Sequence, residues 1–192
     1  MQIFKIIFAI LALIISLTAF YPYIRDIFLG RTKPHVYTWL IWTITQSTAV
    51  FALWYGGGGW GSVELTTGTF FVFIIFLFSL KRGTKNITKS DTVILFIAVL
   101  SILIWWKLNN PILAVIMVSL IDAFGYIPSY RKCWSDPWSE TLSTWGLFAV
   151  GNIFAILALN EYNILTLSYL ITIIICNVIL IIISLLRRKI LK

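Results

Sequence analysis

The chain has 192 residues, of which 60% are hydrophobic and only 11% are charged. Soluble domains carry roughly 25% charged residues, so this composition excludes an ordinary soluble protein and predicts an integral membrane protein in contact with the lipid bilayer. The net charge of +8 comes from basic residues that fall singly or in short clusters between apolar runs. They do not form the single basic stripe that is typical of nucleic-acid binding. We therefore interpret them as a signal of membrane topology and expect no nucleic-acid partner.

Apolar runs follow one another along the chain. A helix needs about 20 apolar residues to cross the hydrocarbon core of a membrane, with a range of roughly 17 to 25. The seven runs lie at approximately residues 4–24, 36–55, 65–80, 91–106, 111–130, 142–159 and 163–186. The third and fourth runs are the short ones. The predicted fold class is an all-α integral membrane protein with seven transmembrane helices.

Basic residues indicate the direction of these spans, because short cytoplasmic loops are enriched in Lys and Arg. With the N-terminus outside, thirteen of the fifteen Lys and Arg fall on the inner side, and only Lys5 and Lys107 remain outside. We expect the N-terminus outside, the C-terminus in the cytoplasm, and the plasma (inner) membrane as the location. Tryptophan prefers the membrane interface, so interfacial anchoring is expected near the outer ends for Trp54, Trp60, Trp105 and Trp106, and near the inner ends for Trp39, Trp42, Trp134, Trp138 and Trp145.

The first half of the sequence is similar to the second. A shift of 106 residues, without a gap, places Pro22 on Pro128, Arg25 on Arg131, Thr38 on Thr144, Trp39 on Trp145, Ala49 on Ala155 and Lys81-Arg82 on Arg187-Arg188. Three spans then correspond to three spans, and one span is left between them. An odd linker helix returns the chain to its starting side, so the two units would be parallel repeats, as in some transporters. The predicted organisation is a first three-helix repeat at 1–84, a loop and linker helix at 85–106, and a second three-helix repeat at 107–192.

A proline near the inner end of the first helix, a basic turn, and a second helix that opens with small polar and aromatic residues resemble the PQ-loop superfamily. Within it, the three-one-three plan is similar to the SWEET sugar transporters, and this resemblance implies a seven-helix transporter. The Gln of the PQ motif is replaced here by Tyr23 and by Ser129. SWEETs usually carry prolines in the second and sixth spans as well, whereas Pro34 and Pro137 of this chain lie in loops.

Polar residues in the middle of the spans are the candidate binding residues, because a polar group at the bilayer centre is costly and usually faces the bundle interior or a cavity. Asp122 lies near the midplane, and its counterpart under the shift is Ser16; Gln46 and its counterpart Asn152 lie at one depth. The plausible neighbours of Asp122 at this depth are Ser16, Gln46, Asn152 and Tyr126. We predict a substrate-binding site at the midplane between the repeats. The alternative is that Ser16, Gln46 and Asn152 only form hydrogen bonds between helices.

Residues outside this polar layer have separate expected roles. The resemblance to SWEETs implies a substrate contact for Asn177 in the last span, and its shifted counterpart is Phe71. Pro22 and Pro128 lie at equivalent inner positions and are predicted hinges, because each removes a backbone hydrogen bond and permits a kink. The only histidine, His35, is interpreted as a solvated loop residue.

The predicted function is transport of a small polar solute, such as a sugar, a nucleoside or a vitamin-like compound, by alternating access. Proton coupling is a further hypothesis, because a carboxyl group held away from water and from cations can bind and release a proton. The sequence has no metal-spaced His, Cys and carboxylate cluster and no Ser–His–Asp arrangement, so we expect no enzyme, no metal and no cofactor. The alternatives are a receptor of the same superfamily and a structural membrane protein that transports nothing. Homo-oligomer formation is left open.

Overall fold

The computed structural model describes residues 2–84, 87–108 and 110–191, and at residues 98, 101–106 and 108 it describes the backbone only. The described residues form helices and no strands. The α-helices are α1 (Gln2–Phe28), α2 (Val36–Tyr55), α3 (Ser62–Arg82), α4 (Lys89–Leu108), α5 (Pro111–Gly125), α6 (Ile127–Ser135), α7 (Leu142–Ala158) and α8 (Ile164–Ile190), and a single 3-10 turn, η1 (Gly59–Gly61), precedes α3.

Polar side chains fix the N-terminal ends of several helices. The side chains of His35 and Asn110 accept hydrogen bonds from backbone N–H groups in the first turns of α2 and α5. At α8 the Asn163 side chain accepts from the first-turn N–H groups, and Thr166 Oγ1 accepts from the Asn163 N–H, which completes a capping box. Each cap satisfies N–H groups that have no partner within the helix. These caps place the helix starts where the hydropathy pattern alone leaves them uncertain.

Within the described residues, four segments are long and apolar enough to cross a membrane, which indicates an integral membrane protein. They are Gln2–Phe28, Gly59–Arg82, Pro111–Ser135 and Ile164–Ile190. Helix α7 is apolar but has only 17 residues. Helix α2 has 20 residues and includes six Thr, Ser and Gln side chains, which lower its mean hydropathy. Length and composition thus identify four membrane spans, and the count of seven remains a proposal.

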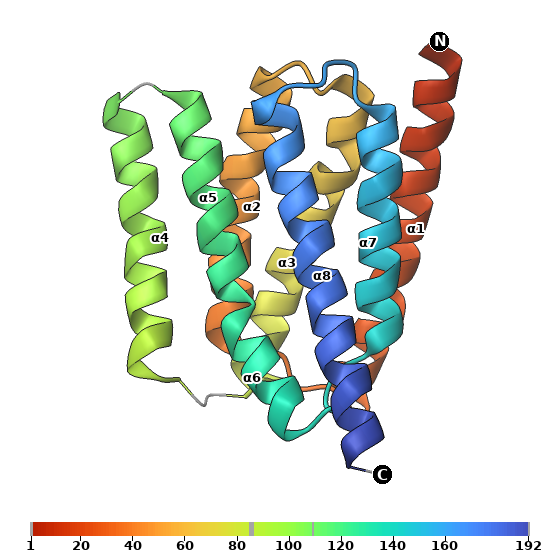
Figure 1. Cartoon of the computed structure of the whole chain (residues 1–192), viewed down its shortest axis with the longest axis vertical. Coiled ribbons are helices and arrows are strands. Elements are labelled where there is room, and N and C mark those ends of the chain that lie inside the picture. Colours follow the sequence, from red (N-terminus) through yellow and green to blue (C-terminus); the bar gives the residue numbers. More distant parts are fainter. Residues whose placement is uncertain (1, 85–86, 109, 192) are drawn as a thin grey trace.

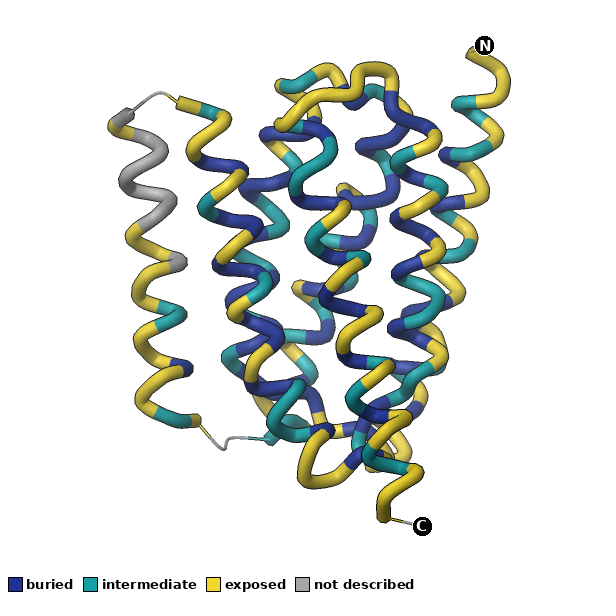
Figure 2. Tube along the Cα trace, viewed as in Figure 1, coloured by how far each residue is buried: buried dark blue, intermediate teal, exposed yellow. Residues whose placement is uncertain are grey.

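The helices stand side by side in one bundle, with the N-terminus at one end and the C-terminus at the other (Figure 1). Helix α3 packs against α1 and α2, and α8 packs against α5 and α7. The two groups meet where α1 packs on α7 and where α2 packs on α5, and α4 covers α5 and α2 from outside. We call the end with the C-terminus the basic end, because Lys and Arg gather there. Buried residues face the inside of the bundle, and exposed residues, most of them apolar, face outward (Figure 2).

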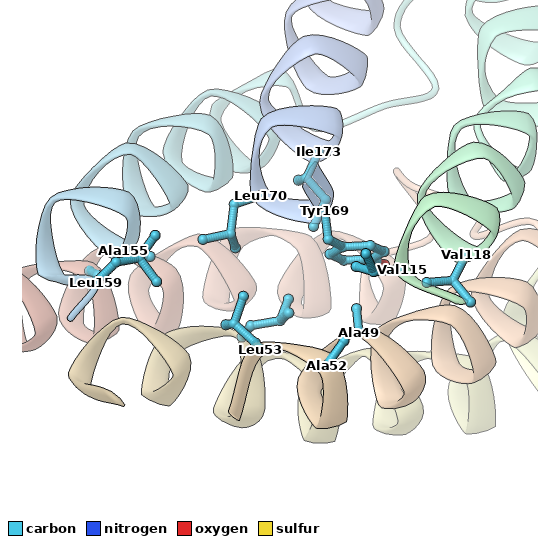
Figure 3. Close-up of a cluster of buried hydrophobic side chains, with 12 residues drawn as sticks. Ala49, Ala52, Leu53, Val115, Val118, Ala155, Leu159, Tyr169, Leu170 and Ile173 are labelled. Carbon is cyan, nitrogen blue, oxygen red and sulfur yellow. The ribbon is translucent and has the colours of Figure 1, made fainter. Parts of the chain in front are cut away.

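Two large apolar clusters lie in the described interior, beside a small third one around Ile41 and Ile121. The first cluster lies toward the end opposite the basic end. It contains several small residues, which let membrane helices approach closely. Figure 3 shows its members Ala49, Ala52, Leu53, Val115, Val118, Ala155, Leu159, Tyr169, Leu170 and Ile173. The second cluster lies toward the basic end and is aromatic, with Phe20, Tyr23, Trp39, Trp42, Tyr126 and Trp145 among its members.

The positions of the tryptophans correct the sequence interpretation in part. Trp39, Trp42 and Trp145 were expected at the interface, but they are buried in the second cluster. They lie on the inward faces of α2 and α7, and the position of a residue along a helix does not specify its face. Exposed side chains, as an interfacial role requires, are found for Trp54, Trp60, Trp134 and Trp138. The side chains of Trp105 and Trp106 lie outside the described residues.

The two predicted hinge prolines have different surroundings. Pro22 lies inside α1, and the helix continues past it to Phe28. Pro128 lies in the first turn of α6, directly after the break between α5 and α6 at Tyr126. A proline has no N–H to donate to the carbonyl four residues earlier, which favours a break before Pro128. The regular helix is therefore interrupted near Pro128 and not at Pro22.

Candidate functional site

A central cavity lies between the two groups of helices. Its volume of about 40 Å³ is room for roughly three water molecules, at about 10–15 Å³ for each. Residues from α1, α2, α3, α7 and α8, together with Tyr126 between α5 and α6, line it. Five of the six predicted binding residues are among them, and these are Ser16, Gln46, Tyr126, Asn152 and Asn177. The fold thus brings these five predicted residues together around one cavity.

Several polar atoms in the cavity wall are buried without a hydrogen-bond partner. The Asn152 amide nitrogen donates to the Phe148 carbonyl at 2.9 Å, and its Oδ1 has no partner. Asn177 Oδ1 accepts from the Tyr126 hydroxyl at 2.8 Å, and its Nδ2 has no partner. Oε2 of Glu64 is also buried and has no hydrogen-bond partner. A buried polar group without a partner costs about 1–3 kcal/mol, so these atoms favour a cavity that holds water or a polar solute.

Glu64 is the cavity residue that the sequence interpretation missed. It lies in the first turn of α3, only 3% exposed, and lines the cavity. The predicted span began at residue 65, so Glu64 was treated as part of the outer loop. Gly61 accounts for its burial, because a Cβ there would lie 2.6 Å from the Ala155 carbonyl oxygen of α7. Without a side chain at Gly61, the start of α3 lies directly on α7, and Glu64 enters the bundle.

Asp122 is buried, with 1% exposure, but it is not among the residues that line the central cavity. Its Oδ1 accepts hydrogen bonds from Thr45 Oγ1 at 2.5 Å and from the Tyr169 hydroxyl at 2.6 Å, and its Oδ2 has no partner. We call Asp122, Thr45 and Tyr169 the Asp122 cluster. It joins α5 to α2 and α8. The neighbours expected for Asp122 were Ser16, Gln46, Asn152 and Tyr126, so its hydrogen-bond partners differ from the prediction.

Aromatic side chains form the wall of the cavity toward the basic end. The ring of Trp42 lies 4.5 Å from that of Tyr126 and 5.7 Å from that of Trp145, between centroids, and Tyr126 and Trp145 are 6.0 Å apart. We call these three residues the aromatic wall. Trp42 is held in place by a 3.3 Å hydrogen bond from its indole nitrogen to the Asp122 carbonyl. Asn177 has no polar counterpart at the shifted position, where Phe71 stacks on Phe20 instead.

The basic end of the bundle is closed by polar contacts between the two groups of helices. Lys132 of α6 pairs with Glu140 and donates a 2.9 Å hydrogen bond to the Lys33 carbonyl. Thr141, before α7, donates a 2.9 Å hydrogen bond to Asp26 of α1.

A second polar cluster at the basic end includes His35. Asp91 of α4 lies 3.3 Å from Arg131 of α6 and 3.7 Å from Nε2 of His35. His35 is only 4% exposed, so the prediction that it is a solvated loop residue is wrong. Its side chain caps α2 by accepting from the Thr38 N–H, which holds the ring inside the bundle.

The opposite end is closed by contacts between two loops. Asn163 Nδ2 donates to the Gly56 carbonyl at 2.9 Å, and the Asn160 N–H donates to the Gly58 carbonyl at 3.2 Å. Lys5 of α1 donates to the Asn160 carbonyl at 3.1 Å. Hydrogen bonds between segments of the two groups of helices are thus found at both ends of the bundle.

Comparison of the chain with protein-family models, with curated proteins and with solved structures found no match. Among the described residues, no group of three His, Cys, Asp or Glu side chains could hold a metal ion. The fold and the site define an all-α integral membrane protein with a small polar and aromatic cavity at its centre.

Proposed function

We propose that this protein is a membrane carrier that moves a small polar solute by alternating access. The observation that carries the proposal is the central cavity, whose wall contains buried polar atoms of Glu64, Asn152 and Asn177 without partners. Their desolvation is costly in a protein that leaves the cavity empty, and a polar solute would offset that cost. The cavity also lies between the two groups of helices, where transporters built from repeats bind their solutes.

The packing order of the helices supports two related units. In the first unit α3 lies against α1 and α2, and in the second α8 lies against α5 and α7 in the same relation. The first residues of α2 and α7, Val36 and Leu142, are separated by the same 106 residues as the sequence repeat. Helix α4 then serves as the linker. We propose seven spans, with the N-terminus outside and the basic end in the cytoplasm of the cell, as the Lys and Arg distribution favours.

The closed ends fit an occluded state of such a carrier. The cavity is several times smaller than a sugar or a nucleoside, so a solute of that size enters only when the two units separate at one end. The contacts that would open are few, chiefly the Lys132 to Lys33 and Thr141 to Asp26 hydrogen bonds at the basic end and the Asn163 to Gly56 hydrogen bond at the other. Rocking of the units about the cavity would break them alternately.

Proton coupling is part of the proposal. The Asp122 cluster joins both units, because Thr45 belongs to α2, whereas Asp122 and Tyr169 belong to α5 and α8. A carboxylate accepts stronger hydrogen bonds than a neutral carboxyl group does. Proton binding at Asp122 would therefore weaken the connection between the units and assist their separation, which links the proton to the conformational step rather than to the solute.

Uptake into proteoliposomes tests the proposed function. The purified chain should give saturable uptake of at least one solute from a panel of sugars, nucleosides, amino acids and vitamins, with a larger signal when a pH gradient is imposed. Asn152→Ala, which removes a polar group of the cavity, should reduce that uptake. Absence of uptake across the panel by folded protein would count against a carrier.

A structural membrane protein is the second candidate, because the small volume of the cavity, about 40 Å³, favours a packed interior. In that case the unpartnered polar atoms would be satisfied by bound water, and no solute would change the stability of the protein. A receptor for an acidic peptide is not favoured, because no Lys, Arg or His is among the described residues that line the cavity.

A further inference from the structure

We infer that the transported solute carries a positive charge, and that Glu64 is the residue that binds the charged group. This inference rests on the proposed carrier function and adds the chemical class of the solute. Three observations carry it. They are the isolation of the Glu64 carboxyl group, the aromatic wall of the same cavity, and the separate engagement of Asp122.

The Glu64 carboxyl group has no basic partner within the described part of the cavity wall, where the remaining polar side chains are Ser, Gln, Tyr and Asn. Its Oε2 is buried and unpartnered. Lys5, which lies toward the same end of the bundle, donates its hydrogen bond to the Asn160 carbonyl instead. A buried carboxylate without a partner is strongly disfavoured, and an opposite charge is what stabilises it. Without a bound cation, burial favours the protonated carboxyl group, and a positive charge on the solute would stabilise the carboxylate.

The aromatic wall supplies the second half of a cation site. Trp42, Tyr126 and Trp145 lie within 6.0 Å of one another, between ring centroids, on the side of the cavity toward the basic end. Glu64 reaches the same cavity from the start of α3, toward the opposite end. Aromatic faces attract ammonium groups through the ring quadrupole, most strongly when water is excluded. A carboxylate combined with aromatic faces favours an organic cation over a neutral sugar.

Asp122 is not available for this role. Its Oδ1 is occupied by Thr45 and Tyr169, and it does not line the cavity. Glu64 and Asp122 therefore divide the work of a carrier. Glu64 contacts the solute, and Asp122 controls the connection between the two units.

Matched pairs of charged and neutral compounds test the inference on the full chain. The first pair is choline and its uncharged isostere 3,3-dimethylbutan-1-ol, and the second is glucosamine and glucose. Thermal unfolding in detergent and uptake into proteoliposomes are measured for each compound. We expect the charged member of at least one pair to stabilise the protein and to be taken up with an affinity roughly tenfold or more above that of its neutral partner.

Variants of Glu64 assign that preference to the residue. Glu64→Gln, which removes the charge at constant size, should lower the affinity for the charged compound by roughly tenfold and leave the neutral one unchanged. Glu64→Asp should retain the preference for the cation. Glu161→Gln is the matched control, because Glu161 is an exposed carboxyl group in the loop between α7 and α8.

The outcomes separate the inference from the proposed function. Equal response to both members of each pair, no response to any of the four compounds, or an unchanged preference in Glu64→Gln would overturn the assignment of a cationic solute. Uptake of neutral solutes from the wider panel would then leave the carrier function standing. If Glu64→Gln fails to fold, the wild-type preference and Glu64→Asp still decide the question.

Discussion

The hydroxyl group of Tyr169 on α8 donates a 2.6 Å hydrogen bond to Oδ1 of Asp122 on α5, and both side chains are buried. The same oxygen accepts from Thr45 on α2. One carboxylate oxygen therefore connects three helices, two from one proposed unit and one from the other. This cluster is a buried polar connection between the two proposed units, and it is the place to test whether the connection is used.

Tyr169→Phe should destabilise the protein by about 1–3 kcal/mol, because it removes a donor from a buried carboxyl group. Denaturant titration in detergent measures the effect, with Tyr162→Phe at an exposed position as the control, expected within about 0.5 kcal/mol of wild type. A double-mutant cycle with Asp122→Asn should give a coupling energy of about 0.5–3 kcal/mol. Strictly additive effects would show that the hydrogen bond contributes nothing to stability.

Asp122→Asn should abolish accumulation driven by a pH gradient while leaving downhill exchange of the solute. The amide cannot bind and release a proton, but the cavity residues stay in place because Asp122 does not line the cavity. Counterflow and gradient-driven uptake in the same proteoliposomes separate the two activities. Normal accumulation by the variant would exclude the proton role, and loss of solute binding would instead place Asp122 in the binding site.

Gly61→Ala should destabilise the protein by roughly 1–3 kcal/mol, because the added Cβ would come within 2.6 Å of the Ala155 carbonyl oxygen and push α3 away from α7. Gly146→Ala is the matched control, since its Cβ would meet only the Ile181 side chain, at 4.0 Å. Alanine is favoured over glycine in a helix by about 0.5–1 kcal/mol, so this variant should be slightly more stable. The thermal unfolding temperatures of both variants check the prediction, and similar shifts for the two would contradict it.

Gly68→Ala should affect stability and transport in opposite directions. Gly68 lies inside α3 and lines the cavity, and an added Cβ would meet no atom within 4 Å. We expect a gain of about 0.5–1 kcal/mol from helix propensity, together with a reduced uptake rate because the methyl group takes up space in the cavity. A stable variant with wild-type uptake would argue that the solute does not pass this position.

Pro22→Ala and Pro128→Ala should impair transport more than solute binding. Pro128 directly follows the break between α5 and α6, whereas α1 continues past Pro22, so we expect the larger effect from Pro128→Ala. Uptake rates and thermal shifts with the same solute compare the two steps for each variant. If the double variant transports at the wild-type rate, the break between α5 and α6 is not a hinge.

The helical fold and much of the cavity could be predicted because both depend on position along the chain. Apolar runs determine where helices lie, and depth in the bilayer identified Ser16, Gln46 and Asn152, which line one cavity together. The depth of a residue in the bilayer, estimated from its position along the helix, does not give the rotation of that helix about its axis. For this reason Asp122 was placed at the correct level but among the wrong neighbours, since its hydrogen bonds come from Thr45 and Tyr169.

Glu64 shows a different limit. An acidic residue in the first turn of a helix usually stays in water and interacts with the helix dipole, and nothing in the local sequence distinguishes Glu64 from that case. Its burial depends on the contact of Gly61 with the backbone of α7, which lies almost a hundred residues away. Trp42 and Trp145 were missed for a related reason, because an indole near the end of a helix is equally suited to lipid and to an aromatic interior.

Glu64 and Asp122 also make the halves of the chain unequal. Glu64 is carried by the third helix of the first proposed unit, whereas Asp122 is carried by the first helix of the second. A homodimer built from two copies of residues 1–84 would contain two copies of Glu64 and lack Asp122, and one built from residues 107–192 would have the reverse composition. Neither half could reproduce the cavity, so co-expression of the two halves as separate chains should be required to restore it.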